Sequence, residues 1–72
     1  MGAVVVLGEA SKVEGYRLAG ATVLVAEDPA AVLRAWADIG SDTALIIVTA
    51  AAARVLDTEL AAGAPLTVVM PP

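Results

Sequence analysis

The residues of this chain that could do chemistry are mostly carboxylates. Glu9 follows the first apolar run of the sequence, directly after Gly8, and Thr49 follows the third run. Ligands of open α/β sheets bind beyond the carboxyl ends of the strands, where the strand order reverses. A receiver domain would need a cluster of acids after its first strand and an aspartate after its third, to hold magnesium and accept a phosphoryl group. One glutamate and one threonine do not supply these groups, so Thr49 is predicted to cap a helix.

Two further patterns are incomplete as ligand sites. Glu27 and Asp28 are adjacent, but a metal held there would lack further ligands, so the pair is predicted to favour the start of a helix through the helix dipole. The spacing of Gly8, Gly15 and Gly20 is too wide for a dinucleotide-binding fingerprint, and no P-loop is present. We therefore predict no metal site and no cofactor.

Composition narrows the function further. The chain has 72 residues, a formal net charge of −4 and neither histidine nor cysteine, which removes most routes to nucleophilic catalysis and to zinc binding. Its four basic residues are scattered, so no nucleic-acid partner is expected. No apolar run approaches the roughly 20 residues that span a bilayer. These features predict a cytoplasmic protein without membrane insertion, without catalytic residues and without enzymatic activity.

The apolar runs predict the fold. Four short runs rich in β-branched residues are continuous rather than alternating, as in strands covered on both faces of a parallel sheet. They are Ala3–Leu7, Thr22–Ala26, Ala44–Val48 and Leu66–Met70. Helical segments between them predict one α/β domain over residues 1–72, a small three-layer flavodoxin-like (Rossmann-like) fold. Right-handed crossovers favour a four-stranded parallel sheet in the order 2-1-3-4 with three helices.

Capping signals place the three helices. Ser11 and Glu14 form a capping box for the first helix, and Asp28 followed by Pro29 opens the second. Thr49 is predicted to open the third. The predicted helix ends are Gly20, Gly40 and Gly63. The second helix should bury a stripe of Val32, Leu33, Trp36 and Ile39, and the third should bury Val55, Leu56 and Leu60.

This strand order leaves part of the sheet uncovered. The first helix would lie on one face and the other two helices on the opposite face, so one face of the third and fourth strands has no helix. We expect a partner protein, a second copy or another segment to cover it.

The first helix contains an unusual stretch, VEGYRLAG. Gly15 inside a short helix costs roughly 1 kcal/mol relative to alanine, which is reasonable where another group must approach closely. Tyr16 and Arg17 are residue types enriched in interface hot spots. Close packing of this helix on its own sheet is an equal alternative. The candidate partner interface comprises Gly15, Tyr16, Arg17, Leu18 and Gly20.

Gly15–Gly20, GYRLAG, resembles the G-F-R-L-A-G motif in the F subunit of the V-type (vacuolar and archaeal or bacterial A-type) rotary ATPases, with Tyr16 in place of phenylalanine. Ala44–Thr49, ALIIVT, is similar to the family's A-L-I-I-I-T. Pro65 and Pro71 flank the last run as prolines do in that family. The resemblance covers nearly all 72 residues in the same order.

The resemblance implies a non-catalytic component of the central stalk. Such a component docks on the coiled-coil D subunit and couples ATP hydrolysis or synthesis in the A/B head to proton or sodium transport, peripheral to the membrane. Family members continue into a C-terminal helical region that this sequence lacks, and alanines at 50–53 replace acids that often follow the third strand. A short family member, or a truncated piece of a longer one, is therefore expected.

An alternative interpretation is a free-standing binding or regulatory module of the same fold. It would hold a small ligand at Gly8–Ser11 and form a homo-oligomer through the uncovered sheet face.

Overall fold

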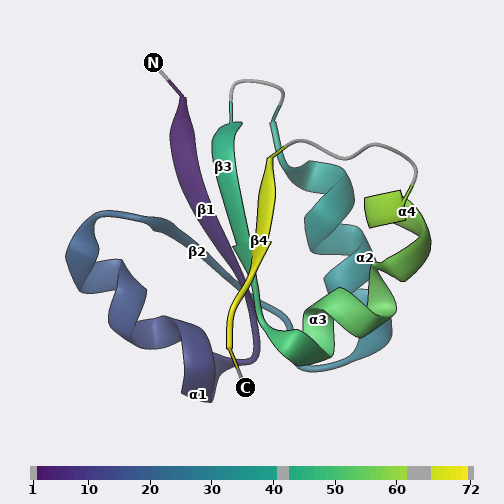
Figure 1. Cartoon of the computed structure of the whole chain (residues 1–72). Coiled ribbons are helices and arrows are strands. Elements are labelled where there is room, and N and C mark those ends of the chain that lie inside the picture. Colours follow the sequence, from purple (N-terminus) through teal and green to yellow (C-terminus); the bar gives the residue numbers. More distant parts are fainter. Residues whose placement is uncertain (1, 41–42, 62–65, 72) are drawn as a thin grey trace.

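A computed structural model of the chain describes residues 2–40, 43–61 and 66–71. Its centre is a sheet of four parallel strands in the order β2-β1-β3-β4 (Figure 1). The strands are β1 (Ala3–Gly8), β2 (Thr22–Val25), β3 (Thr43–Val48) and β4 (Thr67–Val69). The predicted parallel α/β sheet, with its order 2-1-3-4, is confirmed.

Helices lie on both faces of the sheet. They are α1 (Ala10–Val13), the 3₁₀ helix η1 (Glu14–Ala19), α2 (Pro29–Asp38), α3 (Ala50–Val55) and α4 (Asp57–Ala61). In Figure 1, α1 and η1 lie on one side of the sheet, and α2, α3 and α4 lie on the other. None of the helices in the described ranges has both the length and the apolar character needed to cross a bilayer.

The prediction of three helices is wrong for the third, which is divided in two. The backbone at Leu56, with φ −92° and ψ 13°, leaves the helical region, and α4 starts at the next residue. Asp57 and Glu59 lie in the first turn of α4, where acids favour a new helix start. The predicted end at Gly63 lies outside the described residues.

The start of the first helix also differs from the prediction. α1 begins at Ala10 with Glu9 at the N-cap position, so Ser11 lies inside the helix and does not cap it. The Ala10 N–H instead donates to a carboxylate oxygen of Glu27, 3.0 Å away and 17 residues along the chain. The predicted end is confirmed, because Gly20 adopts the left-handed conformation with φ 85°. The second half of this segment is a 3₁₀ helix, consistent with the weak α-helical propensity of Gly15.

The main core lies between the sheet and the layer of α2 and α3. Leu7, Ile46 and Val48 from the central strands pack there against Val32 of α2 and Leu56 at the carboxyl end of α3. On α2 the predicted stripe is partly wrong. Val32 is buried and Trp36 and Ile39 are half-buried against this core, whereas Leu33, one position further around the helix, is exposed.

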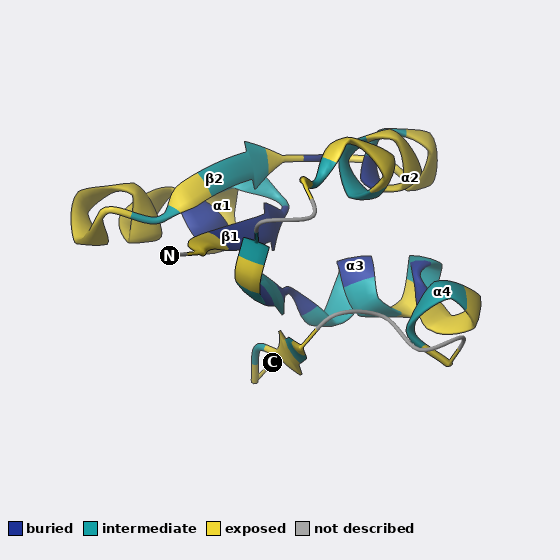
Figure 2. Cartoon of the chain, turned by 90° about the horizontal axis from the view of Figure 1, so that it is seen from above, coloured by how far each residue is buried: buried dark blue, intermediate teal, exposed yellow. Residues whose placement is uncertain are grey.

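The opposite face of the sheet is covered over only half its width. Val13 of α1 is fully buried there, and α1 and η1 lie against β1 and β2. Seen from above, no helix of the described ranges covers β3 and β4 on this side (Figure 2). Val68 of β4 is accordingly 49% exposed, and Ile47 is half-buried. We call this face of β3 and β4, with the adjoining η1, the open face.

Candidate functional site

The carboxyl ends of β1 and β3 bring Glu9 and Thr49 together, although 40 residues separate them. The Thr49 hydroxyl donates to the Glu9 carboxylate, with Oγ1 and Oε1 2.5 Å apart. The Thr49 N–H donates to the Leu7 carbonyl at 3.1 Å, continuing the β1–β3 pairing beyond the strands. The two residues therefore meet at the switch point of the sheet, beyond the strands that they follow in the sequence.

Thr49 is held as a structural residue rather than as a reactive one. Its Oγ1 accepts the Ala52 N–H at 3.3 Å, so the predicted capping of α3 is confirmed. The residue is only 2% exposed, and its hydroxyl is used both as donor and as acceptor. An ideal Cβ on Gly8 would lie 2.5 Å from Thr49 Oγ1, so the glycine is required by close packing. The sequence signal for this contact is a glycine and a β-branched residue at the ends of neighbouring strands.

The Glu9 carboxyl group at this edge of the sheet has a lowered pKa. The hydrogen bond from Thr49 lowers the pKa of Glu9, and a hydrogen bond from its own backbone and the charges of Lys12 and Arg54 act in the same direction. Partial burial opposes these effects. Glu9 is therefore an anchored, ionised carboxylate at neutral pH, which suits it to a fixed charge rather than to a proton donor.

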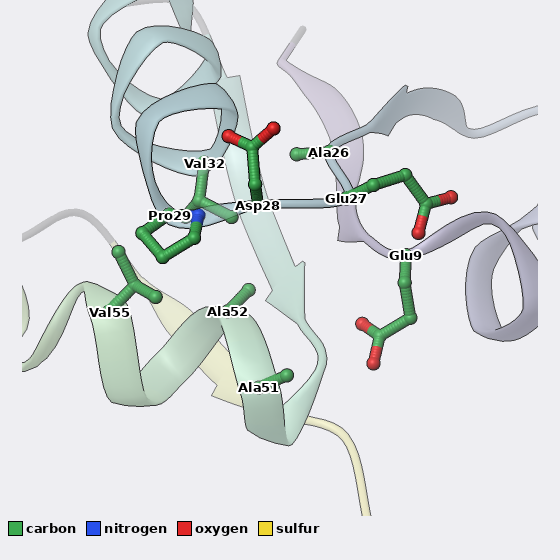
Figure 3. Close-up of a pocket in the computed structure, with 9 residues that line it drawn as sticks. All are labelled: Glu9, Ala26, Glu27, Asp28, Pro29, Val32, Ala51, Ala52 and Val55. Carbon is green, nitrogen blue, oxygen red and sulfur yellow. The ribbon is translucent and has the colours of Figure 1, made fainter.

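A hollow of about 180 Å³ lies between α2 and α3 beside this carboxylate (Figure 3). Its floor is apolar, and Glu9, Glu27 and Asp28 stand at its edge. The last two acids have structural bonds: Glu27 accepts the Ala10 N–H, and Asp28 caps α2 by accepting the Ala31 N–H at 2.8 Å. No group of three or more potential metal-ligating side chains is found in the described ranges.

The five residues of the candidate partner interface lie in η1 and at its end, and all are exposed. Leu18 is 96% exposed and Tyr16 37% exposed. The Arg17 guanidinium pairs with Glu14 of the same turn, with Nη2 and Oε1 2.7 Å apart. No atom of another element lies within 4 Å of an ideal Cβ on Gly15, so within the described chain nothing approaches this glycine closely. Close packing of η1 on its own sheet therefore does not explain Gly15.

A second hollow, of about 400 Å³, lies between η1 and the open part of the sheet. Tyr16 and Gly20 line it from one side, Val4 and Val6 of β1 form part of its wall, and Ile47 of β3 completes it. Sequence reasoning missed this hollow. The strand order indicates such a hollow, because it places the first helix over β1 and next to the uncovered face of β3.

No protein-family model matches this chain, and no curated protein sequence matches it significantly. The fold and the sites define the class: a small flavodoxin-like α/β domain with a hydrogen-bonded glutamate–threonine pair at its switch point and a sheet covered on one face only in part.

Proposed function

We propose that the chain is a non-catalytic central-stalk component of a V/A-type rotary ATPase. It docks on the coiled-coil D subunit of the stalk, in the cytoplasm and peripheral to the membrane. In the assembled complex it contributes to coupling between ATP turnover in the A/B head and proton or sodium transport. The proposal assigns no catalytic residue and no cofactor to the chain.

One observation carries the proposal. The two segments that resemble the rotary-ATPase family, Gly15–Gly20 and Ala44–Thr49, are far apart in sequence, yet Tyr16 of the first and Ile47 of the second line the same hollow. If Gly15–Gly20 served only to end the helix, it would have no reason to line a hollow together with β3. The resemblance thus points to one contiguous surface, the open face.

The chemistry of the open face fits an amphipathic helix. β3 and β4 contain no charged residue, and Leu18 of the adjoining η1 has almost its whole surface in water. The neighbouring ions Glu14 and Arg17 neutralise one another. A helix presenting an apolar stripe can bury these side chains without leaving a charge unpaired, as in other helix-in-groove complexes.

The test is binding of the full chain to the isolated coiled-coil stalk protein, measured by calorimetry. We expect Leu18→Ala and Tyr16→Ala each to weaken binding by about tenfold or more, as truncation of interface hot spots does. Leu33→Ala is the matched control, since Leu33 is an exposed leucine on the opposite layer. Equal affinities of the Leu18 and Leu33 variants, or no binding by the wild-type chain, would refute the proposal.

A second candidate function is a self-associating module of the same fold, and the distribution of exposed apolar groups favours it. Among the described residues, eight large apolar or aromatic side chains are exposed. Five of them lie on the α1 side of the molecule: Val4, Tyr16, Leu18, Val25 and Val68. In a two-fold dimer Leu18 of each copy would enter the hollow of the other, an isologous contact.

Sedimentation equilibrium separates the two candidates. A dimer that Leu18→Ala dissociates and that the coiled-coil stalk protein does not disrupt would support self-association as the function. A monomer, or a dimer that exchanges for a complex with the stalk protein, would support the stalk role.

A further inference from the structure

A third hollow, of about 230 Å³, opens beyond the carboxyl ends of β1 and β3, between α1 and α3. This is the switch point of the sheet, where α/β domains bind their ligands. Its charged lining residues are Glu9, Lys12 and Arg54. The rest of its wall is mainly apolar and includes Ala50, Met70 and Pro71.

The two cations of this hollow are available to a ligand. All four basic residues of the chain lie in the described ranges, and Arg17 is the one with a carboxylate within 4 Å among those residues. Lys12 and Arg54 therefore hold no ion-pair partner in the described chain. Two of the four positive charges of an acidic protein thus converge on one cavity.

We propose that this hollow binds a small monocarboxylic acid with a short alkyl chain, its carboxylate held by Lys12 and Arg54. The Arg54 guanidinium offers a planar pair of N–H donors that matches a carboxylate, and Lys12 adds a second charge. The alkyl chain of the acid lies against Ala50 and Met70.

The charge of the hollow selects a monoanion. Glu9 offsets one of the two cations, so the three side chains together carry a single net positive charge. A monocarboxylate neutralises this charge, whereas a phosphate dianion would place excess negative charge beside the Glu9 carboxylate. Glu9 cannot turn away to relieve that repulsion without losing its bond to Thr49.

The experiment is a ¹⁵N NMR titration of the full chain with butyrate at constant ionic strength. Saturable shifts are expected at the amides of Lys12, Ala50 and Ala51. Lys12→Ala and Arg54→Ala should each weaken binding by about tenfold, the usual effect of removing one hydrogen bond to a charged group. Arg34→Ala, which removes an exposed cation of α2 outside this hollow, is the matched control and should leave the affinity unchanged.

Glu9→Gln should change the affinity for butyrate in the opposite direction to Lys12→Ala and Arg54→Ala. Its amide oxygen can still accept the Thr49 hydroxyl, but the negative charge beside the ligand is gone, so butyrate should bind more tightly. A residue that merely shaped the hollow would weaken binding when changed. Urea unfolding of every variant checks that the fold is retained.

Four results would overturn the proposal. They are an absence of saturable shifts, equal shifts with neutral butyramide, equal affinity for phosphate, and an Arg34→Ala variant that weakens binding as much as Arg54→Ala. Because the titration uses the isolated chain, its outcome is separate from binding to the coiled-coil stalk protein.

Discussion

Replacement of Gly8 by alanine should be among the most damaging single changes in this protein. The new methyl group would lie 2.5 Å from Oγ1 and 2.9 Å from Cβ of Thr49, far inside van der Waals contact. Gly8 is paired with β2 through Val25, and the Ala26 N–H donates to its carbonyl at 2.9 Å, so the backbone of β1 is held in place. Thr49 must therefore move, and with it the cap of α3 and the bond to Glu9.

The cost can be estimated from these contacts. Overpacking a well-packed interior costs about 1–3 kcal/mol, and loss of a helix cap about 1 kcal/mol. We therefore expect Gly8→Ala to lower the free energy of unfolding by about 2–4 kcal/mol. Domains of this length have a total stability of about 4–11 kcal/mol, so the variant should lose a large share of it.

Urea denaturation followed by circular dichroism measures this loss. Thr49→Ala removes the hydroxyl and methyl groups, the two nearest to the new methyl group, and leaves only Cβ in its way. Gly8→Ala should therefore cost less in a Thr49→Ala background than in the wild type. Gly15→Ala is the matched control, because an ideal Cβ there meets nothing within 4 Å, and it should be neutral or slightly stabilising. A cost below about 0.5 kcal/mol, the range of ordinary surface substitutions, would refute the reasoning. So would a cost that is the same in both backgrounds, because the two changes would then be independent.

Two other changes test the local structure. Gly20→Ala should lower the free energy of unfolding by about 1–2 kcal/mol, since a side chain at φ 85° is strained; a loss no larger than that of Gly15→Ala in the same urea series would contradict this. The folded-state pKa of Glu9 is lowered, so its contribution to stability is present above the unfolded-state pKa and is lost as pH falls through the folded-state pKa. Wild type should therefore lose more stability than Glu9→Gln in urea unfolding between about pH 6 and pH 3, and parallel pH profiles would exclude this role.

The sheet could be predicted because its signals are local. Each strand is a continuous apolar run, and the handedness of the crossovers then restricts the strand order. The starts of α2 and α3 were predicted for the same reason, since Asp28 and Thr49 cap amides three residues away.

The start of α1 could not be predicted in this way. The N–H of its first residue, Ala10, donates to the carboxylate of Glu27, which follows the carboxyl end of β2. A local capping box at Ser11 looked sufficient, but the tertiary contact placed the helix start earlier. The Glu9–Thr49 bond belongs to the same class of contact: the sequence places each residue after a strand, but the residue types alone did not indicate a hydrogen bond between them.

The two faces of the sheet bury different amounts of apolar side chain, and this difference affects where a partner protein could bind. Seven buried residues form one cluster on the side of α2 and α3. On the other side, Val13 of α1 is fully buried against the sheet. Tyr16, Leu18 and Val68 on that side keep large parts of their surface in water. A partner on the open face would therefore add a layer of apolar burial that the isolated domain lacks.

A ligand that binds only the folded state raises its apparent stability, so the stalk proposal predicts a higher melting temperature for the chain when the coiled-coil stalk protein is bound. Leu18 is 96% exposed and so contributes little to folding of the isolated chain. Leu18→Ala should therefore leave the melting temperature of the free protein unchanged and reduce the increase on binding. Differential scanning fluorimetry with and without the stalk protein measures both quantities, and an equal increase for wild type and variant would place Leu18 outside the interface.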